Sequence, residues 1–141
     1  MAFSRRYWLV LALCLALQGL GQVRADLVVL HTNDVHCGVE NQLGYAQLAQ
    51  YKKDLMKNPD DTVQLVDAGD AIQGEPLGSL TRGQAVIDIM NVAGYDFAIP
   101  GNHEFDYGVA RLLELAPQLA GGYYSCNLVD LRTGKTVFSA L

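Results

Sequence analysis

Basic residues are few and scattered in this sequence, and cysteines are fewer still. Ten of the 141 residues are lysine or arginine, and they form no cluster, so a polymeric nucleic acid is not an expected partner. The three cysteines are too few for a domain held together by a disulfide framework. Cys37 and Cys126 could pair in an exported protein, but we expect both to stay unpaired.

The sequence also lacks an apolar run long enough for a permanent membrane span. Its main apolar run, 7–17, follows the pair Arg5-Arg6, and Val23-Arg24-Ala25 then supplies small residues at the positions that a signal peptidase reads. This order predicts a signal peptide over residues 1–25, with cleavage between Ala25 and Asp26. We therefore expect export to the periplasm, the extracellular space or the cell surface.

Two export routes are compatible with this N-terminus. The stretch Ser4-Arg5-Arg6-Tyr7-Trp8-Leu9 resembles a twin-arginine signal, and Arg24 places a further charge next to the cleavage site. The short segment before the apolar run and the many leucines within it suit the general secretory route better. We favour the secretory route and keep the twin-arginine route as the alternative.

Acidic residues dominate the chain after the signal peptide. All fifteen acidic side chains lie after residue 25, against seven of the ten basic ones, so residues 26–141 carry a net charge of −8. Half of the sequence is hydrophobic, which is enough to form a core. Cations bound by carboxylates would offset part of the negative charge.

Two kinds of apolar pattern alternate along the chain. Short β-branched runs predict strands, and apolar residues at helical spacing predict helices. The predicted strands cover 27–32, 62–66, 97–99, 123–126 and a last one from 136; the predicted helices cover 44–57, 84–93 and 109–119. The first strand is expected to be buried, and the third helix is expected to end or kink near Pro117. Residues 73–78 are expected to form a glycine-rich loop, and residues 132–135 a turn.

This alternation predicts an α/β fold in the order β-α-β-α-β-α-β, with a mainly parallel sheet and right-handed crossovers. In such a sheet the C-terminal ends of the strands share one edge, where the binding site of open α/β folds lies. Polar side chains follow three successive strands. They are Asp34 and His36, then Asp70, then Asn102 and His103.

These side chains are suited to binding divalent cations. Carboxylate, imidazole and amide groups are hard or borderline ligands, and a single carboxylate can bridge two cations. Paired cations about 3.5–4 Å apart are typical of phosphatases and nucleases. Asp106, three residues after His103, can hydrogen-bond to that imidazole and fix its tautomer. The three motifs together therefore predict a two-metal site.

Each motif alone has a simpler interpretation. Gly101-Asn102-His103 could be a turn with an asparagine N-cap. Asp34 could be an ordinary turn residue and His36 a surface histidine. Asp70 could cap a helix. Three such groups at successive strand ends are harder to explain by capping. Three further residues are expected to have supporting roles: Asp67 structural or orienting a ligand, Glu104 hydrogen-bonded within its turn, and His31 a histidine of the core or sheet.

Three segments carry a resemblance to a known family. They are Leu30-His31-Thr32-Asn33-Asp34-Val35-His36, Asp67-Ala68-Gly69-Asp70-Ala71-Ile72-Gln73-Gly74 and Gly101-Asn102-His103-Glu104-Phe105-Asp106. In this order they resemble the exported 5′-nucleotidases, a family of calcineurin-like metallophosphoesterases, and the similarity extends over residues 27–138. The resemblance implies a nucleotide phosphoesterase with two divalent cations, such as Zn²⁺ or Mn²⁺.

The resemblance also implies a role for each site residue. Asp34 and His36 would bind the first cation, Asp70 would bridge both, and Asn102 would bind the second. His103 would face the phosphate as a transition-state stabiliser or an acid for the leaving group, with Asp106 orienting it.

Two features of the family have no counterpart in this sequence. They are the later histidine motifs, which complete both metal shells, and the C-terminal domain, which holds the nucleotide base. Four ligands do not saturate two cations. We therefore expect 26–141 to be the N-terminal part of a metallophosphoesterase sandwich, inactive alone. The alternatives are a relative acting on cyclic nucleotides, nucleotide sugars or a sulfur ester, and a non-catalytic exported metal-binding module.

Overall fold

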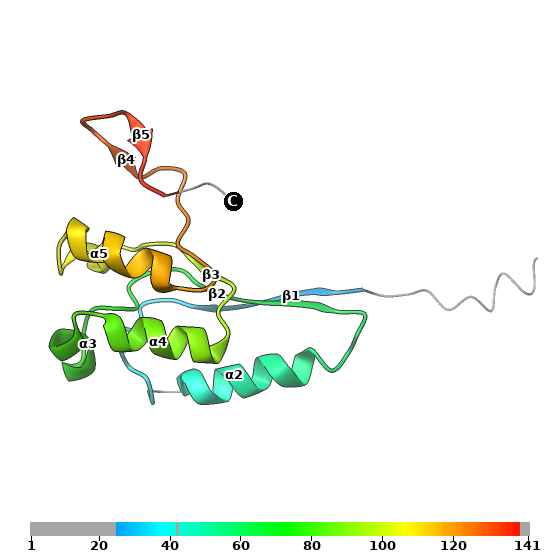
Figure 1. Cartoon of the computed structure of the whole chain (residues 1–141). Helices are drawn as coiled ribbons and strands as arrows, with labels where there is room; N and C mark the ends of the chain where they lie inside the picture. The colour runs from blue at the N-terminus through cyan, green and yellow to red at the C-terminus, as the bar shows by residue number, and fades with distance from the viewer. Residues whose placement is uncertain (1–24, 42, 139–141) are drawn as a thin grey trace, which may run out of the picture.

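Three parallel strands form the sheet that carries the candidate site. In the computed structural model, which describes residues 25–41 and 43–138, β1 (Leu27–Thr32), β2 (Thr62–Asp67) and β3 (Phe97–Ala98) lie in that order (Figure 1). β1 and β2 pair in register from Leu27 opposite Thr62 to Thr32 opposite Asp67, and β3 pairs with the end of β2. The predicted α/β fold with a parallel sheet is confirmed.

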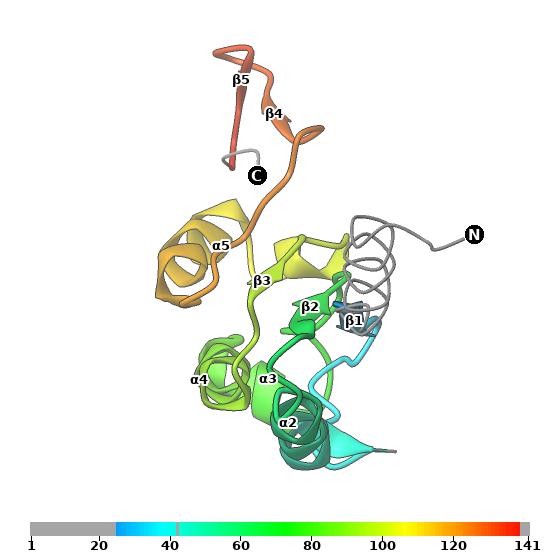
Figure 2. The same ribbon diagram turned by 90° about the vertical axis from the view of Figure 1, so that its right-hand side faces the viewer.

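Two helices connect these strands and gather on one side of the sheet. They are α2 (Gly44–Leu55) and α4 (Gln84–Ala93); Figure 2 shows them there together with the short α3 (Pro76–Thr81). α4 ends where it was predicted to end, because Gly94 adopts a left-handed backbone with φ 79°. The segment predicted to be a glycine-rich loop over 73–78 instead enters α3. Pro76 stands at the first helical position there, which its fixed φ favours.

Burial alternates along the strands. In β2, Val63, Leu65 and Asp67 are buried, and they share the core with helix residues such as Ile87 and Met90. β1 is not buried, contrary to the prediction. It lies at the edge of the sheet, and Leu27 and Val29 are 66% and 50% exposed. An apolar run alone does not distinguish an edge strand, covered on one side, from a central one.

After β3, the described residues contain a 3₁₀ turn over His103–Phe105 and one further α-helix. α5 (Val109–Leu115) is followed by a 3₁₀ turn over Ala116–Gln118, so the predicted break near Pro117 is confirmed. The strand predicted over 123–126 is reduced to a single parallel bridge between Tyr123 and Ala98. Gly121 and Gly122 precede it, and β3 offers a partner of only two residues.

A small hairpin follows, with β4 (Val129–Asp130) antiparallel to β5 (Lys135–Thr136). The turn predicted over 132–135 lies within it, while β4 and the early start of β5 were not predicted. Cys37 is buried and Cys126 is exposed, and both are free thiols. The predicted signal peptide falls outside the described residues except for Ala25. Among the helices of the described residues, none has the length and apolar character needed to cross a membrane.

A partly buried ion pair ties α2 to the rest of the fold. The Nζ atom of Lys52 donates to the carbonyl oxygen of Gly94 at 2.6 Å and to the carboxylate of Asp96 at 2.7 Å. That carboxylate also accepts a hydrogen bond from the backbone N–H of Leu65 in β2 at 2.6 Å. One ammonium group thus joins α2, the end of α4 and, through Asp96, the central strand.

We expect Lys52→Ala to destabilise the fold by about 2 kcal/mol, because it leaves the carbonyl of Gly94 and the carboxylate of Asp96 without their charged donor. Urea unfolding measures the change. Lys53→Ala is the matched control, since Lys53 is exposed on the same helix and should change stability by less than about 0.5 kcal/mol. Equal effects of the two substitutions would contradict a structural role for the Lys52 pair.

Candidate metal centre

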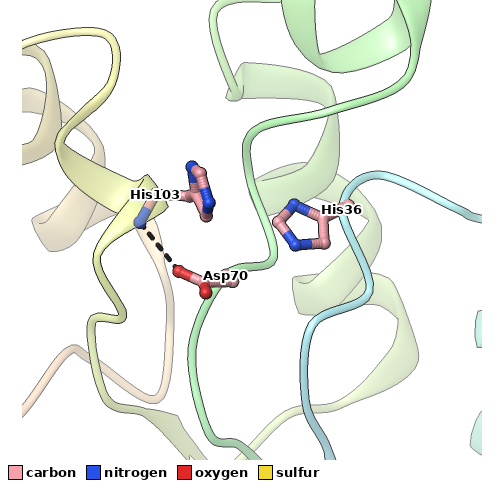
Figure 3. Close-up of side chains that lie close together, drawn as sticks. All are labelled: His36, Asp70 and His103. Atoms are coloured by element: carbon pink, nitrogen blue, oxygen red, sulfur yellow. Dashed lines mark hydrogen bonds between the residues drawn. The ribbon is translucent and has the colours of Figure 1, made fainter.

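The three strands end at one edge, and a loop follows each of them. His36 lies in the loop after β1, Asp70 in the loop after β2, and His103 in the turn after β3 (Figure 3). One ligand atom from each of these three side chains lies within 4.8 Å of the other two. Residues 67 positions apart in the chain therefore come close enough together to share a cation.

The backbone at the predicted ligands is strained. Asp34, His36 and Asp70 have φ values of 54°, 49° and 62°, in the left-handed region that non-glycine residues seldom occupy. Cys37, next to His36, has φ 63°. Such conformations cost about 1–3 kcal/mol each and persist only where the surroundings enforce them, commonly at functional sites.

Glycines allow the loops to pack this closely. A Cβ atom on Gly101 would lie 2.3 Å from Oδ1 of Asp70, and one on Gly69 would lie 2.6 Å from the backbone nitrogen of Gly101. A Cβ on Gly74 would lie 2.2 Å from the carbonyl oxygen of His36. Each side chain would separate two of the loops, so glycine is required at these contacts.

The His36 ring is held in one orientation. Its Nδ1 lies 3.1 Å from the carbonyl oxygen of Gln73, and only a protonated nitrogen can donate to that oxygen. The neutral ring therefore presents the lone pair of Nε2, which lies 3.8 Å from Oδ1 of Asp34. A carbonyl behind the ring is a common support for a metal-binding histidine.

Asp70 is buried, and its carboxylate is partly engaged. Oδ1 accepts a hydrogen bond from the backbone N–H of His103 at 2.8 Å, which the dashed line in Figure 3 marks. Asn102 lies on the same turn and is exposed, as is Asp34 beside His36. The structure thus clusters His36, Asp70 and His103, places Asp34 at the edge of the cluster, and leaves Asn102 on the turn that carries His103.

The His103 imidazole forms a hydrogen bond with the carboxylate of Asp106, as predicted. Its Nδ1 lies 2.8 Å from Oδ2 of Asp106, and the two rings of His103 and His36 meet edge to face with centroids 5.1 Å apart. The hydrogen bond to Asp106 raises the pKa of His103 above its ordinary value, and the charges of Asp70 and Glu104 act in the same direction.

Of three further residues near the centre, Glu104 and His31 differ in part from expectation. Glu104 does bond within its own turn, but its buried carboxylate also accepts backbone hydrogen bonds from Asp70 and Ala71 in the neighbouring loop. No spacing in the sequence signals this long-range contact. Asp67 is buried against Thr32 and Gly69, and burial raises its pKa to about 6. His31 lies in β1 but is exposed, where it and Asp34 line a groove of about 440 Å³.

Comparison with known proteins agrees with this geometry. The family model for the calcineurin-like phosphoesterases matches residues 27–139. The chain belongs to the calcineurin-like phosphoesterase family. The solved calcineurin-like phosphoesterase YfkN of Bacillus subtilis is 28% identical, with a TM-score of 0.67 over 80% of this chain and 40% of its own. The predicted membership of the calcineurin-like phosphoesterases and the predicted fold class are both confirmed.

Nucleotide-processing enzymes are among the relatives in sequence. The 5′-nucleotidase of Rattus norvegicus is 32% identical over 88% of this chain. The 2′,3′-cyclic-nucleotide 2′-phosphodiesterase/3′-nucleotidase of Yersinia enterocolitica is 32% identical over 80% of it. The chain spans 27% and 20% of the length of these two relatives.

The pair formed by His103 and Asp106 gives a testable prediction. We expect Asp106→Asn to lower the pKa of His103, because the substitution removes the hydrogen-bonding anion that favours the protonated ring. NMR titration of the imidazole in metal-free protein measures this. Asp130→Asn is the control, since Asp130 pairs with Arg132 in the hairpin and should leave the titration of His103 unchanged.

The sign of the effect on stability follows from the same pair. Because folding raises the pKa of His103, its protonated ring stabilises the folded protein. This contribution is complete at pH values below the pKa of histidine in the unfolded chain, and it is lost as the pH rises through the pKa of His103 in the folded protein. The difference in stability between the unsubstituted protein and Asp106→Asn should therefore shrink from pH 5 to pH 8. A difference that grows with pH over this range would show that Asp106 acts on something other than His103.

Proposed function

We propose that this chain contributes the metal-binding edge of an exported phosphoesterase that acts on nucleotides. The observation that supports this most directly is the convergence of His36, Asp70 and His103 from three strand ends within 4.8 Å. The family supplies the reaction class, and the relatives named as nucleotidases suggest the substrate. Export is proposed from the N-terminal segment 1–25, with the phosphoesterase domain beginning at residue 26.

The donor set suits divalent cations such as Zn²⁺ or Mn²⁺. In this proposal Asp34 and His36 would hold one cation, Asp70 would serve both, and Asn102 would offer its amide oxygen to the second. The carbonyl of Gln73 behind His36 and the N–H of His103 on Asp70 support these assignments. Other coordination positions are left to water, to substrate oxygens or to further protein groups. When bound, two cations would generate a nucleophile from water and neutralise charge on the phosphoryl oxygens.

His103 is proposed to act on the phosphate. Asp106 occupies its Nδ1, so Nε2 is the atom left to meet a substrate. A protonated ring there donates a hydrogen bond to a phosphoryl or leaving-group oxygen, and such a contribution is typically worth about 10²–10⁴-fold in rate. Asp106 favours the protonated form of the ring.

One observation favours a second candidate function. The cluster of ligand atoms includes His103 itself, so a single cation could be held by His36, Asp70 and His103. This arrangement would make the chain an exported metal-binding module without catalysis. The two candidates differ in what His103 is needed for.

Calorimetric titration of the full chain with Mn²⁺ or Zn²⁺ separates these candidates. Asp70→Asn should weaken binding more than Asp34→Asn, because the bridging carboxylate serves both cations. His103→Asn should leave binding nearly unchanged if His103 faces the phosphate. A loss with His103→Asn as large as with Asp70→Asn would support the metal-binding module.

Phosphate release tests the substrate class. AMP and 2′,3′-cyclic AMP are compared with and without the cation, and Asp70→Asn is the negative control. Release that depends on the cation and is abolished by Asp70→Asn supports the phosphoesterase and contradicts the expectation that residues 26–141 are inactive alone. Release that persists after chelation, or cation binding that Asp70→Asn does not alter, would contradict the proposed centre.

A further inference from the structure

A fully buried carboxylate lies between two of the loops that carry ligands. Glu104 is 0% exposed. Its Oε2 accepts hydrogen bonds from the backbone N–H groups of Asp70 at 2.8 Å and Gly101 at 2.6 Å. Its Oε1 accepts one from Ala71 at 2.8 Å and a longer one from Ile72 at 3.4 Å. One side chain thus binds four backbone amides from two loops.

These hydrogen bonds explain how the charge can be buried. An unpaired carboxylate in the protein interior is strongly destabilising. Among the described residues no ion pair includes Glu104, so backbone N–H groups are its partners. Hydrogen bonds to a charged acceptor are stronger than those between neutral groups, and several of them offset much of the cost of burial. They also fix the position of the groups that donate them.

The contacts between the two loops are reciprocal. Glu104, from the turn after β3, holds the backbone of Asp70, and the carboxylate of Asp70 in turn accepts the N–H of His103. Gly101 makes this possible, because a Cβ there would lie 2.3 Å from Oδ1 of Asp70. Asp70 also has the left-handed φ of 62°, a conformation that persists only when neighbouring groups enforce it.

We propose that Glu104 is the positioning residue of the centre: it holds the Asp70 loop against the Gly101-Asn102-His103 turn. It sets the distance between the bridging carboxylate and the ligand and histidine on that turn. The proposal rests on the metal centre proposed above. An amide cannot replace the carboxylate, because the NH₂ group of glutamine would face backbone N–H donors.

Asp67 provides a matched control. It is also buried, at 1% exposure, and it lies in the same region of the sheet. Its carboxylate accepts hydrogen bonds from the hydroxyl of Thr32 and from the backbone N–H of Gly69, which lies two residues further along the chain. Among the described residues, this carboxylate makes no hydrogen bond to the turn after β3. Asp67→Asn therefore removes a buried charge without releasing the contact between the Asp70 loop and that turn.

Amide hydrogen exchange in the metal-free chain tests the proposal without relying on the cation. In Glu104→Gln we expect the amides of Asp70, Ala71, Gly101 and His103 to exchange at least about 10-fold faster, beyond any change shared by the core amides. The His103 amide is informative because it bonds to Asp70 and not to Glu104. Asp67→Asn should leave the amides of Gly101 and His103 close to the unsubstituted rates.

Titration with Co²⁺, followed by its visible absorption, gives the second measurement. Glu104→Gln should weaken Co²⁺ binding about 10–100-fold, the usual effect of removing a group that orients ligands, and Asp67→Asn should weaken it less. If Glu104→Gln does not fold, Glu104→Asp replaces it in both experiments, since the shorter carboxylate reaches only one loop.

The outcomes separate the two proposals. If amide exchange in Glu104→Gln accelerates uniformly, or if the amides of the two loops exchange at the same rates as in Asp67→Asn, Glu104 is only a core residue. Either result would overturn the inference. Unchanged Co²⁺ affinity in a variant with locally faster exchange would also overturn it. An unsubstituted chain that binds no Co²⁺ contradicts the proposed centre, and in that case amide exchange alone decides whether Glu104 positions the loops.

Discussion

The parallel hydrogen bonding of β1 and β2 is the constraint on which the rest of the site depends, because it continues beyond the ends of both strands. Past the last pair, the N–H of Asp34 donates to the carbonyl of Gly69, that of His36 to Asp70, and that of Cys37 to Ala71. The loop with the first two candidate ligands therefore lies along the loop with the bridging carboxylate as an irregular extension of the sheet. Asp34, His36, Cys37 and Asp70 are left-handed residues of this extension, and at these points its backbone departs from strand geometry.

Packing the loops this tightly has an electrostatic consequence. The carboxylates of Asp67, Asp70 and Glu104 lie close together, and the charges of the other two help to raise the pKa of Asp67, although burial is the main cause. Backbone N–H groups offset much of this repulsion, and Glu104 takes the largest number of them. Cations at the centre would offset more of it, and by binding only the folded form they would also stabilise the fold.

The sequence allowed the fold class and the family to be predicted because the relevant signals are local. Strand ends, the helix stop at Gly94 and the polar residues after each strand are all visible within a few positions. The exposure of β1 and the reduction of the strand at Tyr123 to one bridge depend on what lies next to them in space. The hydrogen bond between Glu104 and Asp70 joins residues 34 positions apart in the chain, and no periodic pattern in the sequence indicates such a contact.

The two possible roles of His103 differ in the protonation state that each requires. Asp106 accepts a hydrogen bond from Nδ1, so the neutral ring presents a lone pair at Nε2, as a cation requires, and the protonated ring presents an N–H, as a phosphate requires. The hydrogen bond to Asp106 raises the pKa of the ring and so favours the form suited to phosphate. Nearby cations would lower that pKa, but Asp106 remains bonded directly to the ring. A carboxylate on the second ring nitrogen is also a common support for a metal-binding histidine, so the pairing with Asp106 is compatible with both roles, and the effect of His103→Asn on cation binding distinguishes them.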